Sequence, residues 1–321
     1  MKKKPSILVT GATGYIGGLT LAALAKKKDE LGALTALDVR AVPEGSRLPG
    51  VDYVELSVTE RKIREVFSSH GIDTVVHLAS VLRPPARGGQ DLSYRVDVVG
   101  TQNVLAACLE TGVRRIVVTT SGASYGYHPR DHEWLDENDP IEGNREIPYS
   151  WHKRLIEREL AEYREKHPEL AQLVFRPGTV IGETVSSPVT DLFERRAILG
   201  VAGGESPFVF IWDQDVVECL VRGALGDQTG IYNLAGDGTL SPREIARRLG
   251  KPYLPVPEAV IRLALGVLHR LGKSPWGAEQ VKFLRYRPVL SNRRLKEQFG
   301  YTPQKSSSEA FDVYAKSRRA P

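Results

Sequence analysis

The first half of the chain alternates short apolar runs with longer amphipathic runs, and this alternation limits the possible folds more than any other feature. Apolar runs of strand length occupy residues 6–10, 34–38, 51–56, 73–79, 114–121 and 173–176. Runs with helical periodicity lie among them, at residues 15–28, 59–69, 92–111 and 149–166. Strands that alternate with helices form βαβ units with parallel strands. We therefore predict an α/β fold built on a doubly wound parallel sheet.

The second half of the chain is less regular. After about residue 177, helices and short strands mix between prolines at 188, 207, 242, 252, 255, 257, 275 and 288. The length of 321 residues corresponds to about two domains of average size. We predict a sheet domain over residues 1–176 and a smaller mixed lobe over 177–321, part of whose chain returns to the sheet.

Composition excludes several classes of protein. Hydrophobic residues make up 41% and charged residues 26%, which excludes wholesale disorder. The net charge of +5 forms no basic stripe with interleaved aromatic residues, so we expect no nucleic-acid partner. No apolar run reaches the roughly 20 residues of a membrane span, and we expect no membrane partner. The helical run 257–271 has two interpretations: it packs in the lobe, or it binds at a membrane surface. Cys108 and Cys219 are far apart, as expected of buried free thiols in the cytoplasm.

A glycine-rich segment follows the first predicted strand. Residues 10–18 read TGATGYIGG, which places glycines at 11, 14 and 17 in the pattern G-x-x-G-x-x-G at the start of a helix. Such a turn brings the backbone close to a pyrophosphate, and the N-terminus of the helix favours negative charge. The segment therefore predicts a Rossmann-type dinucleotide site, with contacts from Gly11, Thr13, Gly14, Tyr15, Ile16 and Gly17.

An acidic residue follows at the distance that this site requires. Asp38 lies 21 residues after Gly17, at the end of the second strand, where a carboxylate binds the ribose hydroxyls of adenosine. The carboxylate repels a 2′-phosphate, so we predict NAD, with Val39 and Arg40 beside the adenosine. NADP stays open because Arg40 carries a charge that suits a 2′-phosphate.

A second motif indicates acid/base chemistry. Tyr149 and Lys153 form the pattern Y-x-x-x-K at the start of a predicted helix, so both side chains lie on one helix face. An unperturbed tyrosine ionises with a pKa near 10, and a neighbouring ammonium stabilises its phenolate. This pairing suits Tyr149 to exchange a proton near neutral pH.

Five motifs together resemble one known family. They are TGATGYIG, HLAS at 77–80, TTSGASYG at 119–126, YSWHK at 149–153 and RPGTVIG at 176–182. In order and spacing they are similar to the extended short-chain dehydrogenases/reductases, which include NAD-dependent epimerases and dehydratases. The resemblance implies that Ser121 hydrogen-bonds the reacting oxygen, that Tyr149 is the acid/base and that Lys153 holds the nicotinamide ribose. It also implies a homodimer through the helices at 92–111 and 149–166, and further cofactor contacts from Ser57, Val58, Leu78, Ala79, Ser80, Thr119, Arg176, Pro177, Gly178 and Val180.

The sequence departs from this family at several positions. Asp97 stands where relatives usually carry Asn, and Ser57 where an acidic residue usually contacts the adenine. Sugar-nucleotide enzymes usually carry an Asn where this chain has Gly178, and an Arg in the region that here reads GGESPFVFIWDQD. Without these polar groups, we expect an apolar or aromatic substrate to fit the lobe at least as well as a nucleotide sugar.

Three further groups of residues have competing interpretations. Trp151 and His152 indicate packing, in the core or at a dimer interface. The segment HPRDHE at 128–133 looks like a metal cluster, but Pro129 disturbs helical spacing, so we predict no metal site. Segment 83–90 suits a mobile lid whose Arg83 or Arg87 meets an anionic substrate, or else a plain surface loop.

The sequence thus predicts an NAD-dependent oxidoreductase that acts on a carbinol or carbonyl carbon of a small molecule. The first alternative is a sugar-nucleotide epimerase that retains its NAD. A dehydratase is disfavoured, because Gly122 and Ala123 occupy the place of its usual acidic pair. The second alternative is a dinucleotide-sensing protein without catalysis, against which Ser121, Tyr149 and Lys153 speak.

Overall fold

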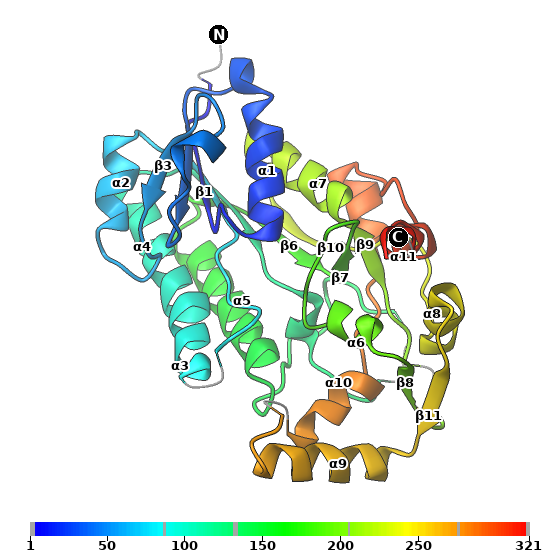
Figure 1. The fold of residues 1–321 in the computed structure, drawn as a ribbon. Coiled ribbons are helices and arrows are strands. Elements are labelled where there is room, and N and C mark those ends of the chain that lie inside the picture. The colour runs from blue at the N-terminus through cyan, green and yellow to red at the C-terminus, as the bar shows by residue number, and fades with distance from the viewer. Residues whose placement is uncertain (1–3, 86–87, 131–133, 205, 275–276, 319–321) are drawn as a thin grey trace.

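A seven-stranded parallel sheet forms the centre of the computed structural model, which describes residues 4–85, 88–130, 134–204, 206–274 and 277–318 (Figure 1). The strand order is β10-β6-β5-β4-β1-β2-β3, so the winding direction reverses between β1 and β4. This order confirms the predicted Rossmann-type doubly wound sheet, and ligands bind such sheets at the reversal point. The strands are β1 Ile7–Thr10, β2 Leu34–Asp38, β3 Asp52–Glu55, β4 Thr74–His77, β5 Arg115–Thr119, β6 Ala171–Pro177 and β10 Gly230–Leu234.

Helices cover both faces of the sheet. Successive side chains of a strand point to opposite faces, so Ile7 and Val9 enter one core cluster and Leu8 enters the other. Helices α1 Tyr15–Ala25 and α7 Asp213–Leu225 pack on the first face. Helices α2 Ile63–Ser69, α4 Gly100–Thr111 and α5 Pro148–Lys166 pack on the second.

The long helix expected over 92–111 is divided into three parts. Helix α3 Gly89–Tyr94 leads into a π-helical stretch, Arg95–Val99, which continues as α4. The hydroxyl of Thr101 donates a hydrogen bond to the carbonyl oxygen of Asp97, at 2.5 Å. Single π-turns inside α-helices often re-aim side chains at functional sites. Here the π-helical stretch carries Asp97 to the ends of the sheet strands.

The smaller lobe contains two parallel strand pairs and its own core. Strand β7 Thr179–Ile181 pairs with β9 Phe210–Trp212, and β8 Ile198–Val201 pairs with β11 Tyr253–Val256. Its helices are α6 Thr190–Glu194, α8 Pro242–Leu249, α9 Glu258–Arg270, α10 Val281–Arg285 and α11 Ser307–Ser317. The lobe core is aromatic and contains Phe193, Phe208, Phe210, Phe311 and Tyr314.

The chain crosses between the two parts more than once. Strand β10 and helix α7 come from the second half of the sequence, yet β10 pairs with β6 and α7 packs on α1. Part of the second half thus lies in the sheet, and the domain boundary at residue 176 stays a prediction. Among the described residues, no helix is both long and apolar enough to span a membrane. Both cysteines are free and buried.

Candidate active site

The loop between β1 and α1 forms a cradle made of backbone. Gly11 adopts a φ of +66°, and a Cβ atom there would lie 2.7 Å from the backbone nitrogen of Ala79. A Cβ atom on Gly17 would lie 2.0 Å from the carbonyl oxygen of Gly11. Gly14 is the N-cap of α1 and has no side chain to cover the first-turn N–H groups. These groups are therefore free to bind phosphates, as in dinucleotide sites.

The carboxylate of Asp38 closes one side of this cradle. It accepts hydrogen bonds from the backbone nitrogens of Thr13 and Arg40, both at 3.1 Å, and Nε of Arg40 lies 3.5 Å away. A pocket beside it is lined by Thr13, Asp38, Arg40 and also by Arg47, which the sequence did not single out. The Thr13 hydroxyl is buried without a hydrogen-bond partner in the described chain. A glycine cradle, an open helix end and an unused hydroxyl fit a dinucleotide here.

Other predicted cofactor residues around the cradle have different surroundings. The Tyr15 hydroxyl donates a 2.5 Å hydrogen bond to Asp213 of α7, while Ile16 packs against the first core cluster. Val39 is 59% exposed, and its contact with the adenosine remains a prediction. The Ser57 hydroxyl bonds that of Thr59. Val58 is buried beneath Gly100, and Val180 of β7 packs on the first core cluster.

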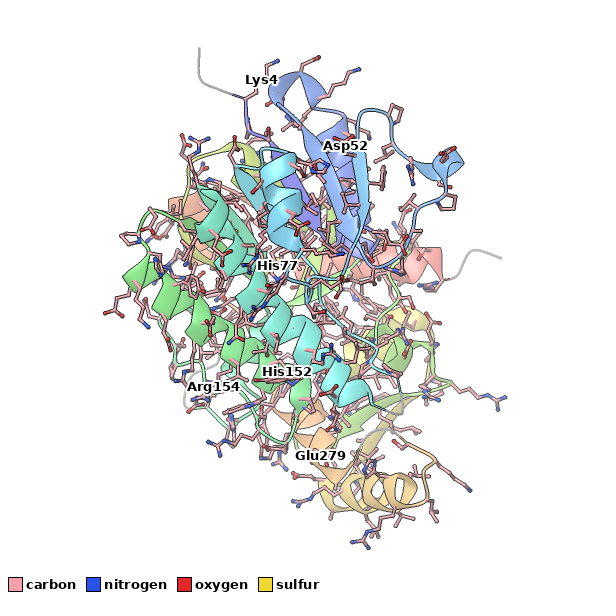
Figure 2. The ribbon with its side chains drawn as sticks, turned by 90° about the vertical axis from the view of Figure 1, so that its left-hand side faces the viewer. Lys4, Asp52, His77, His152, Arg154 and Glu279 are labelled. Atoms are coloured by element: carbon pink, nitrogen blue, oxygen red, sulfur yellow. The ribbon has the colours of Figure 1, made fainter. Side chains whose placement is uncertain are left out.

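The end of β4 is held by a network of hydrogen bonds. The Thr10 hydroxyl oxygen accepts hydrogen bonds from the backbone nitrogens of Leu78 and Ala79. It also lies 2.7 Å from Nδ1 of His77, whose Nε2 lies 3.0 Å from the Thr101 hydroxyl (His77 is labelled in Figure 2). Burial, together with the nearby charge of Lys153, lowers the pKa of His77 to about 4. His77 is therefore neutral at physiological pH and supports the backbone around the predicted cofactor residues.

Three predicted site residues meet where β4 and α5 face each other. Nζ of Lys153 donates a hydrogen bond to the Ser80 hydroxyl, at 3.2 Å. It also lies 5.5 Å from the centre of the Tyr149 ring, on the same face of α5. Lys153 is buried, so its charge acts on these neighbours with little screening. The arrangement places an ammonium beside a phenol, as the Y-x-x-x-K pattern predicts.

Ser121 begins a short turn that is tied to the same helix. After Thr119, the last residue of β5, Ser121 caps the 3₁₀ turn Gly122–Tyr125 by accepting the Ala123 N–H. The carbonyl oxygen of Ala123 accepts a 2.7 Å hydrogen bond from the Ser150 hydroxyl of α5. The turn that carries Ser121 and the helix that carries Tyr149 are therefore locked together.

Asp97 and His152 lie buried behind Lys153. One carboxylate oxygen of Asp97 accepts a 3.0 Å hydrogen bond from the Val81 N–H, and the other lies 3.7 Å from Nδ1 of His152. Burial raises the pKa of Asp97, but His152 and the charge of Lys153 outweigh this effect and hold the pKa below its usual value. The carboxylate is therefore ionised beside the predicted catalytic lysine.

The guanidinium group of Arg176 is held by other groups of the protein. Its guanidinium forms a two-point ion pair with Glu157, at 2.9 and 2.8 Å, and donates to the Tyr125 hydroxyl. The neighbouring Pro177 ends β6, and a Cβ atom on Gly178 would lie 3.0 Å from the Val209 side chain. The Arg176 side chain is thus structural, and a cofactor contact from this segment remains a prediction for its backbone.

An aromatic wall lies beside Tyr149. Tyr149 packs in one cluster with Tyr127, Phe283 and Tyr286, and the rings of Tyr127 and Phe283 are 5.3 Å apart. The Arg287 guanidinium lies 5.0 Å from the centre of the Phe283 ring and 3.7 Å from that of Phe208, and its Nη1 donates a 2.7 Å hydrogen bond to the Ser206 carbonyl oxygen. Burial lowers the pKa of Arg287 to about 9, so it stays charged at neutral pH. Nothing in the local sequence around these residues points to this position.

The remaining residues singled out in the sequence lie outside the arrangement around Lys153. Arg83 forms a two-point ion pair with Asp191 of α6, at 2.7 and 2.9 Å, which links the loop after β4 to the lobe. Arg87 and residues 131–133 lie outside the described residues. Within the part of the chain that the structure covers, no group of three or more His, Cys, Asp or Glu residues could hold a metal ion. Trp151 lies between the guanidinium groups of Arg145 and Arg154.

Comparison with solved structures supports the fold assignment. The UDP-glucose 4-epimerase of Thermotoga maritima, solved with UDP-glucose, matches with a TM-score of 0.74 and 19% identity, over 98% of each chain. The Thermus thermophilus UDP-glucose 4-epimerase, in complex with NAD, matches with a TM-score of 0.73 and 22% identity, over 98% of this chain and all of the other.

Sequence relatives extend over most of the chain. An uncharacterized protein of Mycobacterium tuberculosis is 26% identical over 97% of this chain and 84% of its own length. A UDP-glucose 4-epimerase of Erwinia amylovora is 30% identical over 55% of this chain and 54% of its own. The model of the NAD-dependent epimerase/dehydratase family matches residues 7–235. This protein therefore belongs to the NAD-dependent epimerase/dehydratase family.

Proposed function

We propose that the protein is an NAD-dependent oxidoreductase that interconverts a carbinol and a carbonyl group on a small molecule. The observation that carries the proposal is the buried Lys153 ammonium, bonded to Ser80 and set beside the Tyr149 ring. Bound NAD supplies a hydride acceptor, and NADH a donor. The glycine cradle, Asp38 and the backbone at Leu78 and Ala79 hold the cofactor.

Tyr149 moves the proton in this proposal. Its phenolate accepts a proton from the carbinol, or its phenol donates one to the carbonyl oxygen. The charge of Lys153 stabilises the phenolate, and the Ser121 hydroxyl hydrogen-bonds the same substrate oxygen. The hydrogen bond from the Ser150 hydroxyl to the Ala123 carbonyl oxygen fixes the turn that carries Ser121 relative to the helix that carries Tyr149.

An aromatic or otherwise apolar alcohol is the substrate class that we propose. The wall of Tyr127, Phe283 and Tyr286 gives apolar surface beside Tyr149. Phe208 and Phe210 pack in the lobe core and do not belong to this wall. Gly178 offers no side-chain amide for a diphosphate and leaves little room for one beside Val209.

We propose NAD rather than NADP as the cofactor. The Asp38 carboxylate lines the adenosine pocket and repels a 2′-phosphate, although Arg40 and Arg47 line it too. Titration calorimetry with both cofactors tests this assignment. Tighter binding of NADP than of NAD would overturn it. Asp38→Asn is expected to lower the ratio of NAD affinity to NADP affinity.

The reaction is tested by incubating purified protein and cofactor with panels of aromatic alcohols, ketones and UDP-sugars. Absorbance of reduced nicotinamide reports net redox, and chromatography of the sugars reports epimerisation without net redox. We expect turnover of an apolar alcohol or ketone, reduced about 10²–10⁴-fold in Tyr149→Phe with NAD binding retained. Full activity of Tyr149→Phe would overturn the assignment.

A sugar-nucleotide epimerase that retains NAD is the second candidate. The specific observation in its favour is Arg287, whose Nη1 donates to the Ser206 carbonyl oxygen but whose Nε is buried without a hydrogen-bond partner in the described chain. For an epimerase, we expect a UDP-sugar to be epimerised without net change in NADH. Arg287→Gln is then expected to weaken binding of the UDP-sugar but not binding of an alcohol that carries no nucleotide.

We also propose a cytoplasmic homodimer that uses the surface of α3, α4 and α5. Leu92, Tyr94 and Val99 are 42%, 42% and 38% exposed on this surface. Sedimentation velocity is expected to give a dimer, which Val99→Glu dissociates. A monomer at all concentrations would contradict this proposal.

A further inference from the structure

Helix α9 presents an apolar face to solvent. Only Ile261 of this helix is buried, whereas other apolar side chains at helical spacing point outward. Leu263 is 70% exposed, Leu271 62% and Val260 53%. Val267 and Leu268 are 47% and 41% exposed. A contiguous exposed face of this kind marks an interaction surface.

Packing in the lobe, one of the two roles predicted for this segment, accounts for only part of the helix. The helix lies along one end of the molecule, with α10 on its inner side (Figure 1). Figure 2 shows the same end near the label of Glu279, opposite the end that carries Lys4. Ile261 packs inward with Val201 and Val281, and this small cluster covers the inner face of the helix. The outer apolar face has no partner among the described residues.

The surroundings of α9 are strongly basic. Residues 251–287 contain seven Lys or Arg and two Glu, an excess of five positive charges that equals the net charge of the whole chain. Glu258, the one acidic residue of α9, is neutralised by Arg285. Arg262, Arg270 and Lys273 are exposed and form no ion pair within the described chain. The apolar face is thus accompanied by uncompensated positive charge.

We propose that α9 is an interfacial helix that docks the protein on a membrane with anionic lipids. An amphipathic helix with Leu and Val on one side and Arg or Lys beside them lies in the plane of the membrane surface. Its apolar side chains enter the boundary between headgroups and acyl chains, while the long Arg side chains extend to the phosphates. Negatively charged headgroups complement Arg262, Arg270 and Lys273. The proposal does not depend on the reaction proposed above.

A second copy of the chain fits this surface less well. Pairing two α9 faces would bring the three uncompensated cations of each copy together, and like charges at an interface are unfavourable. The surface proposed for the homodimer involves α3, α4 and α5, on another side of the molecule from α9 (Figure 1). Both α9 faces of such a dimer stay available for a membrane.

Co-sedimentation of the full-length protein with lipid vesicles tests the proposal. Vesicles of phosphatidylcholine alone are compared with vesicles that also contain about 30% of the anionic lipid phosphatidylserine. We expect binding to the anionic vesicles that falls as salt concentration rises. Arg262→Gln/Arg270→Gln is expected to weaken partition about 25-fold, at about fivefold per cation. Leu263→Glu/Val267→Glu is expected to abolish it.

A matched control separates local from general charge effects. Arg61→Gln/Lys62→Gln removes two exposed cations next to α2 and is expected to bind vesicles like the wild type. NAD binding of each variant reports that it is folded, because the exposed positions on α9 lie outside the cofactor cradle. No binding to anionic vesicles, or equal binding by the α9 variants, would overturn the proposal. A self-association that Leu263→Glu/Val267→Glu removes, without vesicle binding, would assign the face to a second copy instead.

Discussion

The His152 imidazole faces the Asp97 carboxylate inside the protein, with Nδ1 of His152 3.7 Å from Oδ2 of Asp97. Neither atom has a hydrogen-bond partner among the described residues, and both side chains are almost excluded from solvent. Since Lys153 follows His152 directly and interacts with Asp97, the Asp97 carboxylate adds a negative charge beside the predicted catalytic residues. The Asn that relatives usually carry at position 97 adds none.

Asp97→Asn is predicted to change the pH dependence of catalysis. Removing the negative charge favours the phenolate of Tyr149, so the acidic limb of the kcat/KM profile moves down by about 0.5–1 pH unit. The profile is measured on a substrate identified by the redox panel. An unchanged profile would show that the Asp97 charge does not reach Tyr149.

Ser80→Ala is predicted to lower kcat/KM about 10–100-fold, because a hydrogen bond to a charged group contributes about 1.5–3 kcal/mol. The substitution removes the oxygen that accepts the Lys153 ammonium hydrogen bond. Ser93→Ala is the control: its hydroxyl donates to the Gln90 carbonyl, away from Lys153, and activity is expected to stay within about twofold. Equal kinetics in both variants would remove the positioning role of Ser80.

Gly17→Ala is predicted to weaken NAD binding about 10–100-fold in titration calorimetry, since forcing atoms into a packed site costs about 1–3 kcal/mol. The new Cβ atom would lie 2.0 Å from the Gly11 carbonyl oxygen. Gly18→Ala places its Cβ atom 3.7 Å from the nearest atom and is the matched control. If Gly17→Ala binds NAD like Gly18→Ala, the cradle does not hold the cofactor.

Glu157→Gln is predicted to destabilise the fold by about 3–5 kcal/mol in urea unfolding, because it leaves the buried Arg176 charge uncompensated. The exposed Glu165→Gln, on the same helix, is expected to change stability by less than about 0.5 kcal/mol. A similar stability for both variants would mean that water or another group already neutralises Arg176.

His77 is predicted to make the protein less stable in mild acid. Its pKa falls from 6.5 to about 4 on folding, so above pH 6.5 it is neutral in both states. As pH falls from 6.5 to about 4, the unfolded state takes up a proton that the folded state refuses, which costs about 3 kcal/mol. Unfolding free energies measured across this range are expected to be flatter for His77→Asn, and an equal slope would contradict the assignment.

Local sequence was enough to predict the sheet, the glycine cradle and the spacing of Tyr149 and Lys153. Each of these depends on residues a few positions apart, whose geometry follows from backbone conformation and from strand and helix periodicity. The role of Asp38 could be predicted because this residue ends the second strand, a short distance along the chain from the glycine-rich segment. The family membership then agreed with these motifs.

Only the tertiary structure showed which distant side chains meet. The Ser80–Lys153 contact, the Asp97–His152 pair and the place of Arg287 over the Phe208 ring join segments that are far apart along the chain. Arg176 belonged to a predicted cofactor segment, but its charge is held by Glu157. For α9 the sequence determined an apolar side, and the fold decided that most of this side stays uncovered. Periodicity records which side of a helix is apolar, whereas what covers that side depends on how all the other elements pack.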